Sequence, residues 1–160
     1  MRLTLDVAGD RQLARELLRV GEHGDDVAPA LRQIADYWRD LAREQFATEG
    51  ASGSGGWPPL APATVQRKRG SADPRVRRNA ETILVATGAL REGLTDAGDE
   101  QHVERVTRDE LEFGTLVDYV GYHQHGTSRA PQRRPVELTE TERRETMRRL
   151  QRWVLTGELV

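Results

Sequence analysis

The chain has 160 residues, 36% of them hydrophobic and 31% charged, with a formal net charge of −2, which fits one domain with a modest core. A balance this close to neutral argues against a general nucleic-acid binder, because such proteins carry a strong basic excess. The sequence has no cysteine, which excludes disulfides, thiolate metal sites and a cysteine nucleophile.

In the N-terminal part of the chain, the pattern predicts one strand and two helices. Residues 1–7 alternate apolar and polar side chains, as in a strand and unlike a signal peptide. Asp10 is placed to cap a short helix that the glycines at 21–24 should end. Asp25 or Asp26 then caps a longer helix. The apolar face of this longer helix consists of Leu31, Ile34, Trp38, Leu41 and Phe46.

Residues 49–79 are rich in glycine and proline and are expected to form a mobile loop, with at most a turn of helix over 64–69. Trp57 follows a flexible Gly/Ser run and precedes Pro58 and Pro59, which stiffen the chain. This arrangement predicts an arm that ends in an anchoring side chain. We expect Trp57 to dock into a neighbour on assembly and to order the loop.

Short elements are expected between this loop and residue 115. Ile83–Val85 is an apolar run compatible with a buried strand, and 89–94 is compatible with a brief helix. Segments 102–107 and 110–115 are β-like, and the second alternates apolar and acidic residues as a half-buried strand does. The dipeptide at 108–109 between them is predicted to be a hairpin turn.

The C-terminal part is predicted to contain an extended segment and a helix. Residues 133–136 include a proline and are expected to be an edge strand. Thr139 and Glu142 match a capping box. The apolar face of the following helix consists of Met147, Leu150, Trp153 and Val154. Together the elements predict an α+β fold. It comprises a small antiparallel sheet, a long helix in the N-terminal half, a C-terminal helix packed on the sheet and a long Gly/Pro-rich loop, all in a single domain over 1–160.

Charge is unevenly distributed along the chain. A basic arm, residues 67–78, contains Arg67, Lys68, Arg69, Arg75, Arg77 and Arg78 against one acid, Asp73. An acidic hairpin region, residues 92–112, contains eight carboxylates and only two arginines. These two regions could pair between identical copies, or they could be two independently solvated faces. The basic arm also leaves a nucleic-acid-binding module as an alternative, although it lacks the aromatic residues that base stacking requires.

No residue constellation in the sequence predicts catalysis. His123 and His125 could offer two imidazoles to a metal, which would suit a metal-dependent hydrolase, but no downstream His or Cys completes a tetrahedral set. The serines lie in loop-like sequence without a nucleophile-elbow motif. The Gly/Ser run lacks the lysine and helix of a phosphate-binding loop. We therefore expect no enzyme, no metal and no cofactor, and no apolar run approaches the ~20 residues of a membrane span.

Four segments, taken in order, resemble the phage virion morphogenesis family of Mu-like tail completion proteins, and the resemblance spans about the whole chain. The first is Trp57-Pro58-Pro59-Leu60 with Thr64 and Lys68; the second is residues 83–91, with Gly88 and Leu90. The third has Tyr119, His123 and Gly126; the fourth is residues 130–135, with Arg134 and Pro135. Val120 and the pair at 136–137 depart from the family pattern.

The resemblance implies a non-enzymatic structural protein that acts in tail completion and head–tail joining. It implies a homo-oligomeric ring, with a hexamer expected, because that junction is built on a rotational axis. Its partners would be other copies of itself and phage neck or tail proteins, with no membrane and no specific nucleic acid. It would lie in the virion, at the head–tail junction or tail end, and in the host cytoplasm during assembly.

Two sets of residues follow from this reading. Residues expected in self-association or partner contact are Trp57, Leu60, Thr64, Arg67, Lys68, Arg75, Arg77, Arg78 and Arg134. Residues expected to maintain the motif structure are Gly88, Leu90, Tyr119, His123, Gly126 and Pro135. Gly88 and Gly126 suit positions with positive φ. The Arg134 guanidinium is expected to be available to a carboxylate.

Overall fold

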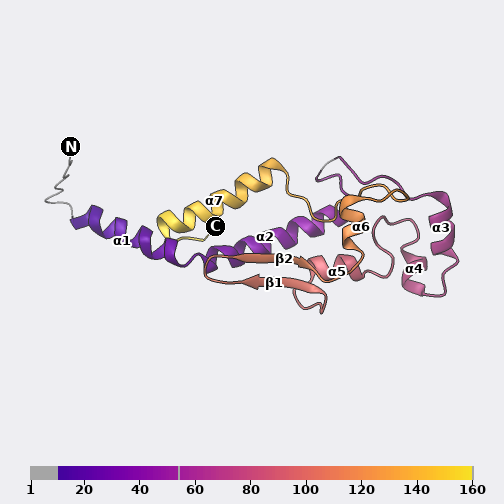
Figure 1. The fold of residues 1–160 in the computed structure, drawn as a ribbon, viewed down its shortest axis with the longest axis horizontal. Helices are drawn as coiled ribbons and strands as arrows, with labels where there is room; N and C mark the ends of the chain where they lie inside the picture. The colour runs from indigo at the N-terminus through magenta and orange to yellow at the C-terminus, as the bar shows by residue number, and fades with distance from the viewer. Residues whose placement is uncertain (1–10, 54, 160) are drawn as a thin grey trace.

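A computed structural model describes residues 11–53 and 55–159, with side chains from residue 18 onward. The predicted strand over 1–7 and the cap at Asp10 lie outside the described residues. The molecule is elongated, with helix α1 (Arg11–Asp25) at one end and the short helices α3 (Pro62–Arg69) and α4 (Pro74–Arg78) at the other (Figure 1). Among the described residues, the structure contains no helix both long enough and apolar enough to cross a bilayer.

Helix α2 (Ala28–Ala47) is the central element, and its predicted apolar face is confirmed. Leu31, Ile34 and Phe46 are buried along it. The N-cap is Val27 and not one of the two expected aspartates, although the Asp26 carboxylate accepts a 3.0 Å hydrogen bond from the backbone N–H of Ala28 at the first position of the helix. Each such bond satisfies a backbone donor that has no partner within the helix.

The predicted end of α1 at the glycines is wrong, because the helix runs through Gly21 and Gly24 to Asp25. A glycine in a helix costs only about 1 kcal/mol relative to alanine. Packing against the C-terminal helix α7 (Glu140–Thr156) outweighs this cost. At that contact the rings of His23 and Trp153 lie 5.4 Å apart, and the Trp153 Nε1 donates to the Asp26 carbonyl at 2.9 Å.

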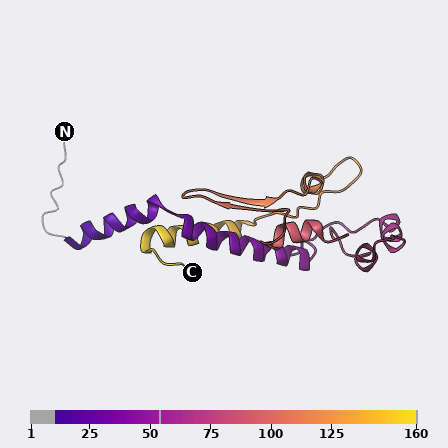
Figure 2. The same cartoon turned by 90° about the horizontal axis from the view of Figure 1, so that it is seen from below.

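The predicted hairpin is confirmed as strands β1 (His102–Val106) and β2 (Leu111–Thr115), which pair antiparallel with Glu104 opposite Phe113. Figure 2 shows the hairpin as a layer on one side of α2. Phe113 packs edge-on against Trp38 with ring centroids 5.8 Å apart, and Glu104 pairs with Arg39 of α2. The fold is therefore α+β, with a two-stranded antiparallel sheet and long helices.

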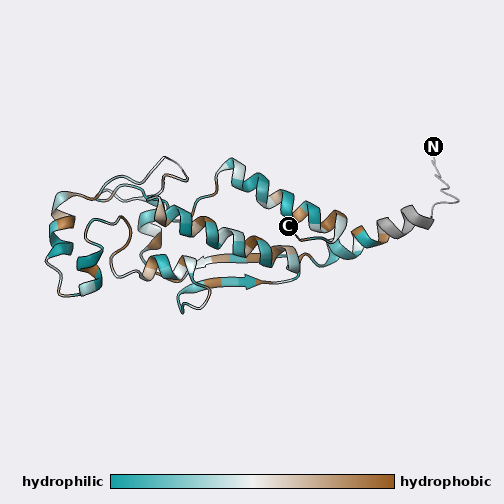
Figure 3. Cartoon of the chain, turned by 180° about the vertical axis from the view of Figure 1, so that it is seen from behind, coloured by the Kyte–Doolittle hydropathy of each residue, from teal (hydrophilic) through white to brown (hydrophobic). Residues whose placement is uncertain are grey.

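The capping box at the start of α7 is confirmed. The Glu142 N–H donates to the Thr139 hydroxyl at 3.3 Å, and the Thr139 N–H donates to the Glu142 carboxylate. The helix packs on α1 and α2, and its ribbon in Figure 3 is largely hydrophilic with separated apolar positions. Leu150, Trp153 and Val154 are partly buried as expected. Met147, however, is 52% exposed.

Residues 49–79 contain α3 and α4, which is more helix than the single turn expected, and their other described residues are irregular. The predicted strand over Ile83–Val85 is also wrong: these residues form a turn, in which Leu84 has a φ of 56°. Side chains from other segments provide hydrogen-bond partners for backbone groups of this turn. The Glu49 carboxylate accepts from the Ile83 N–H and Lys68 donates to the Val85 carbonyl, both at 2.8 Å.

The edge strand expected over 133–136 is likewise irregular in the structure. Its backbone forms a hydrogen bond with another segment: the Arg133 N–H donates to the carbonyl of His123 at 2.9 Å. His123 lies in the short helix α6 (Val120–His125). A further short helix, α5 (Ala89–Thr95), confirms the element expected over 89–94 and begins at Gly88.

One hydrophobic cluster connects α2 with this end of the molecule. It consists of Ala42, Phe46, Trp57, Ile83, Val85, Leu90, Leu94 and Val117, with Leu60, Leu84 and Val120 packed against it. The segment expected to be a mobile arm therefore contributes an aromatic side chain to the core.

Candidate interaction groove

The four segments that carry the family resemblance meet around one groove, at the end of the molecule that contains α3, α4 and α6 (Figure 1). The groove has a volume of about 1090 Å³. Of the residues singled out in the sequence, those that line it are Leu60, Thr64, Arg67, Lys68, Gly88, Leu90, Tyr119 and His123. The sequence order of the segments gave no indication that they share one surface.

Trp57 is not an exposed docking residue, which corrects the expectation. Its side chain is 7% exposed and packs edge-on against Phe46, with ring centroids 5.4 Å apart. Its backbone N–H donates to the Glu49 carbonyl at 2.7 Å, and its Nε1 donates to the Arg134 carbonyl at 3.1 Å. An aromatic residue among prolines is here part of the chain's own core. Whether the rest of 49–79 orders on assembly stays a prediction.

Lys68 is also an internal residue and does not belong to an available basic surface. Its Nζ donates to the carbonyls of Thr82 and Val85, both at 2.8 Å, and its side chain is buried. Burial lowers the pKa of the Lys68 amine, and the Glu49 carboxylate opposes that shift. The amine therefore holds the turn at 82–85 against α3.

Arg133 is the arginine that the sequence analysis missed. Its guanidinium is buried and donates to the carbonyls of Pro58 and Pro59, at 2.7 and 2.8 Å. Burial lowers its pKa. The expected Arg134 points its guanidinium outward and pairs with Glu137 of its own chain at 2.8 Å. When two adjacent arginines precede a proline, the sequence does not indicate which of the two side chains is buried.

Tyr119 and His123 form an aromatic pair on the groove wall, with ring centroids 6.0 Å apart and planes at 88°. Burial lowers the pKa of His123, and the Arg133 guanidinium lowers it further. His125 is exposed. Within the part of the chain that the structure describes, no group of three His, Asp or Glu side chains is placed to hold a metal ion.

The expected glycine geometry is confirmed at both positions. Gly88 has a φ of 109° where α5 begins, and Gly126 has a φ of 72° after α6. A Cβ on Gly126 would lie 2.9 Å from the backbone nitrogen of Gln132. Gly126 therefore permits both the turn and the close approach of the segment that leads to Arg133. Leu90 and Pro135 are buried, as structural roles require.

The basic arm is partly neutralised within the chain. Arg75 pairs with Asp73 at 3.0 Å, and Arg77 donates to the carbonyls of Ser71 and Ala72. Arg67 and Arg78 are exposed, and their guanidinium groups make no hydrogen bond or ion pair within the described residues. The positive charge available to a partner is therefore smaller than the sequence count.

The charged side chains that line the groove are all positive within the described residues. Its lining contains Arg67, Lys68, Arg129 and Arg133 and, within the described residues, no carboxylate. Arg129 is exposed like Arg67, and its guanidinium has no partner among the described residues. The rest of the lining includes the aliphatic side chains of Leu60, Val76, Leu84 and Leu90.

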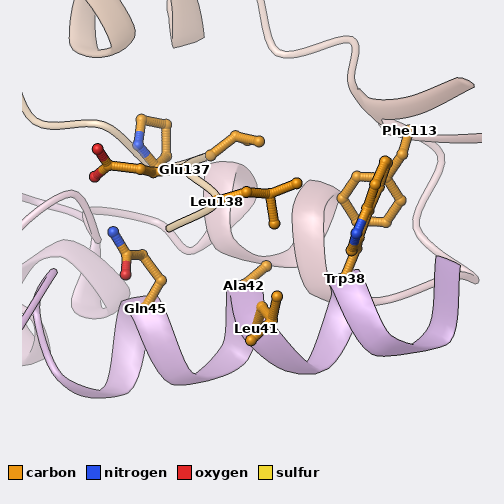
Figure 4. A pocket seen from close by; sticks show the side chains of 9 residues that line it. Trp38, Leu41, Ala42, Gln45, Phe113, Glu137 and Leu138 are labelled. Atoms are coloured by element: carbon orange, nitrogen blue, oxygen red, sulfur yellow. The ribbon is translucent and has the colours of Figure 1, made fainter. Parts of the chain in front are cut away.

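A second, much smaller cavity of about 80 Å³ lies between α2 and the segment before α7. Figure 4 shows Trp38, Leu41 and Ala42 on one side and Leu138 on the other, with Phe113 beside Trp38. Its lining is mainly apolar, so this cavity is a gap in core packing beneath residues 135–138.

No family model, no curated protein and no solved structure matches the chain.

Proposed function

We propose that the chain is a non-enzymatic phage assembly protein that acts in tail completion and head–tail joining through protein–protein contacts. The observation that supports this proposal is the convergence of the four resemblance segments on one groove. Hydrogen bonds between them fix the groove: Trp57 donates to the Arg134 carbonyl, Lys68 donates to the Val85 carbonyl of the second segment and to that of Thr82 just before it, and Arg133 donates to those of Pro58 and Pro59. The groove is the surface we assign to a phage neck or tail protein.

The working form that we propose is a ring, with a hexamer as the expected size. The basic arm lies on α3 and α4, whereas much of the acidic region lies on the β1–β2 hairpin along α2 (Figure 1). Two unlike surfaces on one chain suit a head-to-tail contact, which closes into a ring when the rotation is right. Virion localisation and the hexamer belong to this proposal.

The apolar part of that contact has to come from residues other than Trp57. An exposed ion pair contributes only about 0–1 kcal/mol and is screened by salt. Leu116, just after β2, is 61% exposed, and Tyr122 of α6 is 66% exposed. We propose that these two side chains provide apolar burial between copies, while the charges set register and encounter rate.

Sedimentation velocity across a salt series tests the ring, with negative-stain images to count subunits. The double variant Arg67→Glu/Arg78→Glu changes two exposed arginines of the basic arm, and Arg19→Glu/Arg32→Glu, at exposed positions of α1 and α2, is the charge-matched control. We expect an oligomer that dissociates in high salt and in the double variant but persists in the control. A chain that stays monomeric at all concentrations would contradict the proposal. So would an oligomer that neither high salt nor the double variant dissociates.

A further inference from the structure

We propose that the groove binds an extended, acidic segment of a partner protein that inserts aliphatic side chains between Arg67 and Arg129. This inference rests on the proposed function, because it names the partner chemistry of the same groove. It does not depend on ring formation.

The groove is large enough to accommodate a short peptide segment. Its volume of about 1090 Å³ exceeds the roughly 300–1,000 Å³ of common ligand pockets. The walls come from α3, α4 and α5, from α6 and from the segment 129–133. A surface assembled from so many elements extends over a length of bound chain.

Aliphatic side chains make up part of the groove lining. Leu60, Val76 and Leu84 line the groove and are each only partly buried, so part of each side chain faces the groove. Pro59, Pro62 and Pro131 also line it. Because proline has no backbone N–H, these positions cannot donate to a pairing strand. Recognition therefore relies on apolar side chains of the partner and not on strand addition.

The charge of the groove selects an acidic partner. Arg67 and Arg129 line it with guanidinium groups that have no partner within the described residues. Lys68 and Arg133 add positive charge deeper in the wall, although both are hydrogen-bonded to carbonyls. An arginine binds a carboxylate with two parallel hydrogen bonds. No carboxylate of the described lining competes for them.

The same lining disfavours a single-stranded nucleic acid. Bases stack on aromatic side chains, which supply much of the affinity in such sites. In the described lining, the aromatic rings are those of Tyr119 and His123, and they pack against each other edge-to-face at 6.0 Å. The aliphatic side chains of the lining offer apolar contact without a stacking platform.

Fluorescence polarisation on the full chain tests the inference with three labelled probes. These are the peptide Glu-Leu-Asp-Leu-Glu-Leu-Asp, the same peptide with lysine at every acidic position, and oligodeoxythymidine. We expect the acidic peptide to bind, and the lysine peptide not to. Arg67→Glu/Arg129→Glu should weaken binding by about tenfold or more, because it removes both unpaired guanidinium groups. Arg32→Glu, on α2, should leave the affinity unchanged.

Methyl NMR of the unmodified chain provides a second measurement that does not depend on a variant folding. Titration with the acidic peptide should shift the methyl resonances of Leu60, Val76 and Leu84, which line the groove. Absence of binding, equal binding of the lysine peptide, preference for the oligonucleotide, or shifts confined to other surfaces would each overturn the inference.

The two proposals fail separately. A salt-sensitive ring that binds no acidic peptide would reject the partner chemistry and keep the assembly role. A monomer that binds the peptide in the groove would reject the ring and keep the partner chemistry.

Discussion

The indole Nε1 of Trp57 donates a 3.1 Å hydrogen bond to the backbone carbonyl of Arg134, which lies 77 residues further along the chain. In the opposite direction, the guanidinium of Arg133 donates hydrogen bonds to the carbonyls of Pro58 and Pro59. Each segment thus satisfies polar groups of the other. The prolines and the arginine pair form one structural unit that closes the groove end of the molecule.

Replacing Trp57 with alanine should unfold the monomer more easily. Loss of the buried indole and of its contact with Phe46 should lower the free energy of unfolding by about 3–5 kcal/mol. Urea unfolding at two protein concentrations measures this, with Leu155→Ala as the control because Leu155 is 65% exposed. A variant of unchanged stability that only associates less would restore the docking role for Trp57.

Lys68→Met should destabilise the fold although it keeps the aliphatic stem. The carbonyls of Thr82 and Val85 would lose their donor, at about 1–3 kcal/mol for each buried group left unsatisfied. Arg69→Met is the matched control, because the neighbouring Arg69 pairs with Glu81 at the surface and such pairs contribute about 0–1 kcal/mol. Denaturant unfolding of both variants makes the comparison. Equal losses would show that Lys68 has no internal role.

Stability should decrease as the pH falls below 6.5 because of His123. Burial, followed by the Arg133 guanidinium, lowers the pKa of its imidazole below the ordinary 6.5. Between the folded pKa and 6.5 the unfolded chain therefore binds more protons, so acidification favours unfolding. Urea unfolding over a pH series should give a flatter slope in this window for His123→Gln than for the parent. Identical slopes would rule out His123 as the group responsible.

Gly126→Ala should destabilise the groove end, whereas Gly121→Ala should not. At Gly126 the positive φ and the close approach of Gln132 should make alanine lower the free energy of unfolding by about 1–3 kcal/mol. Gly121 lies within α6, and a Cβ added there would meet no atom within 4 Å, so alanine should be neutral or stabilise by about 0.5–1 kcal/mol. Thermal unfolding of both variants distinguishes them. A tolerated Gly126→Ala would mean that the turn adapts without strain.

Elements set by local pattern were predictable. The face of α2 repeats with helical spacing, the capping box places Thr139 and Glu142 three residues apart, and Leu111 and Phe113 alternate along β2. In each case the residues that determine the element are neighbours in sequence. The α+β class followed from these elements.

The site was predictable only as a set of segments. Ile83–Val85 has a strand-like composition, but Glu49 and Lys68 bind its backbone from distant positions. Trp57 among prolines gives no local signal of burial, and nothing in the dipeptide 133–134 shows which guanidinium turns inward. These outcomes depend on contacts between segments far apart in sequence, which residue spacing does not encode.

The link between Trp57 and Arg134 also dictates an order of events during synthesis. At about 5–20 residues per second, a ribosome needs roughly 4–15 s to add the 77 residues that separate the two partners. Leu60, Leu84 and Leu90 join the nascent chain during that interval, before the segment that closes over their end of the molecule has been made. This end therefore consolidates only after Arg134 has been added, and until then its leucines are accessible to a chaperone, whereas the packing of α7 on α1 waits for residues that follow.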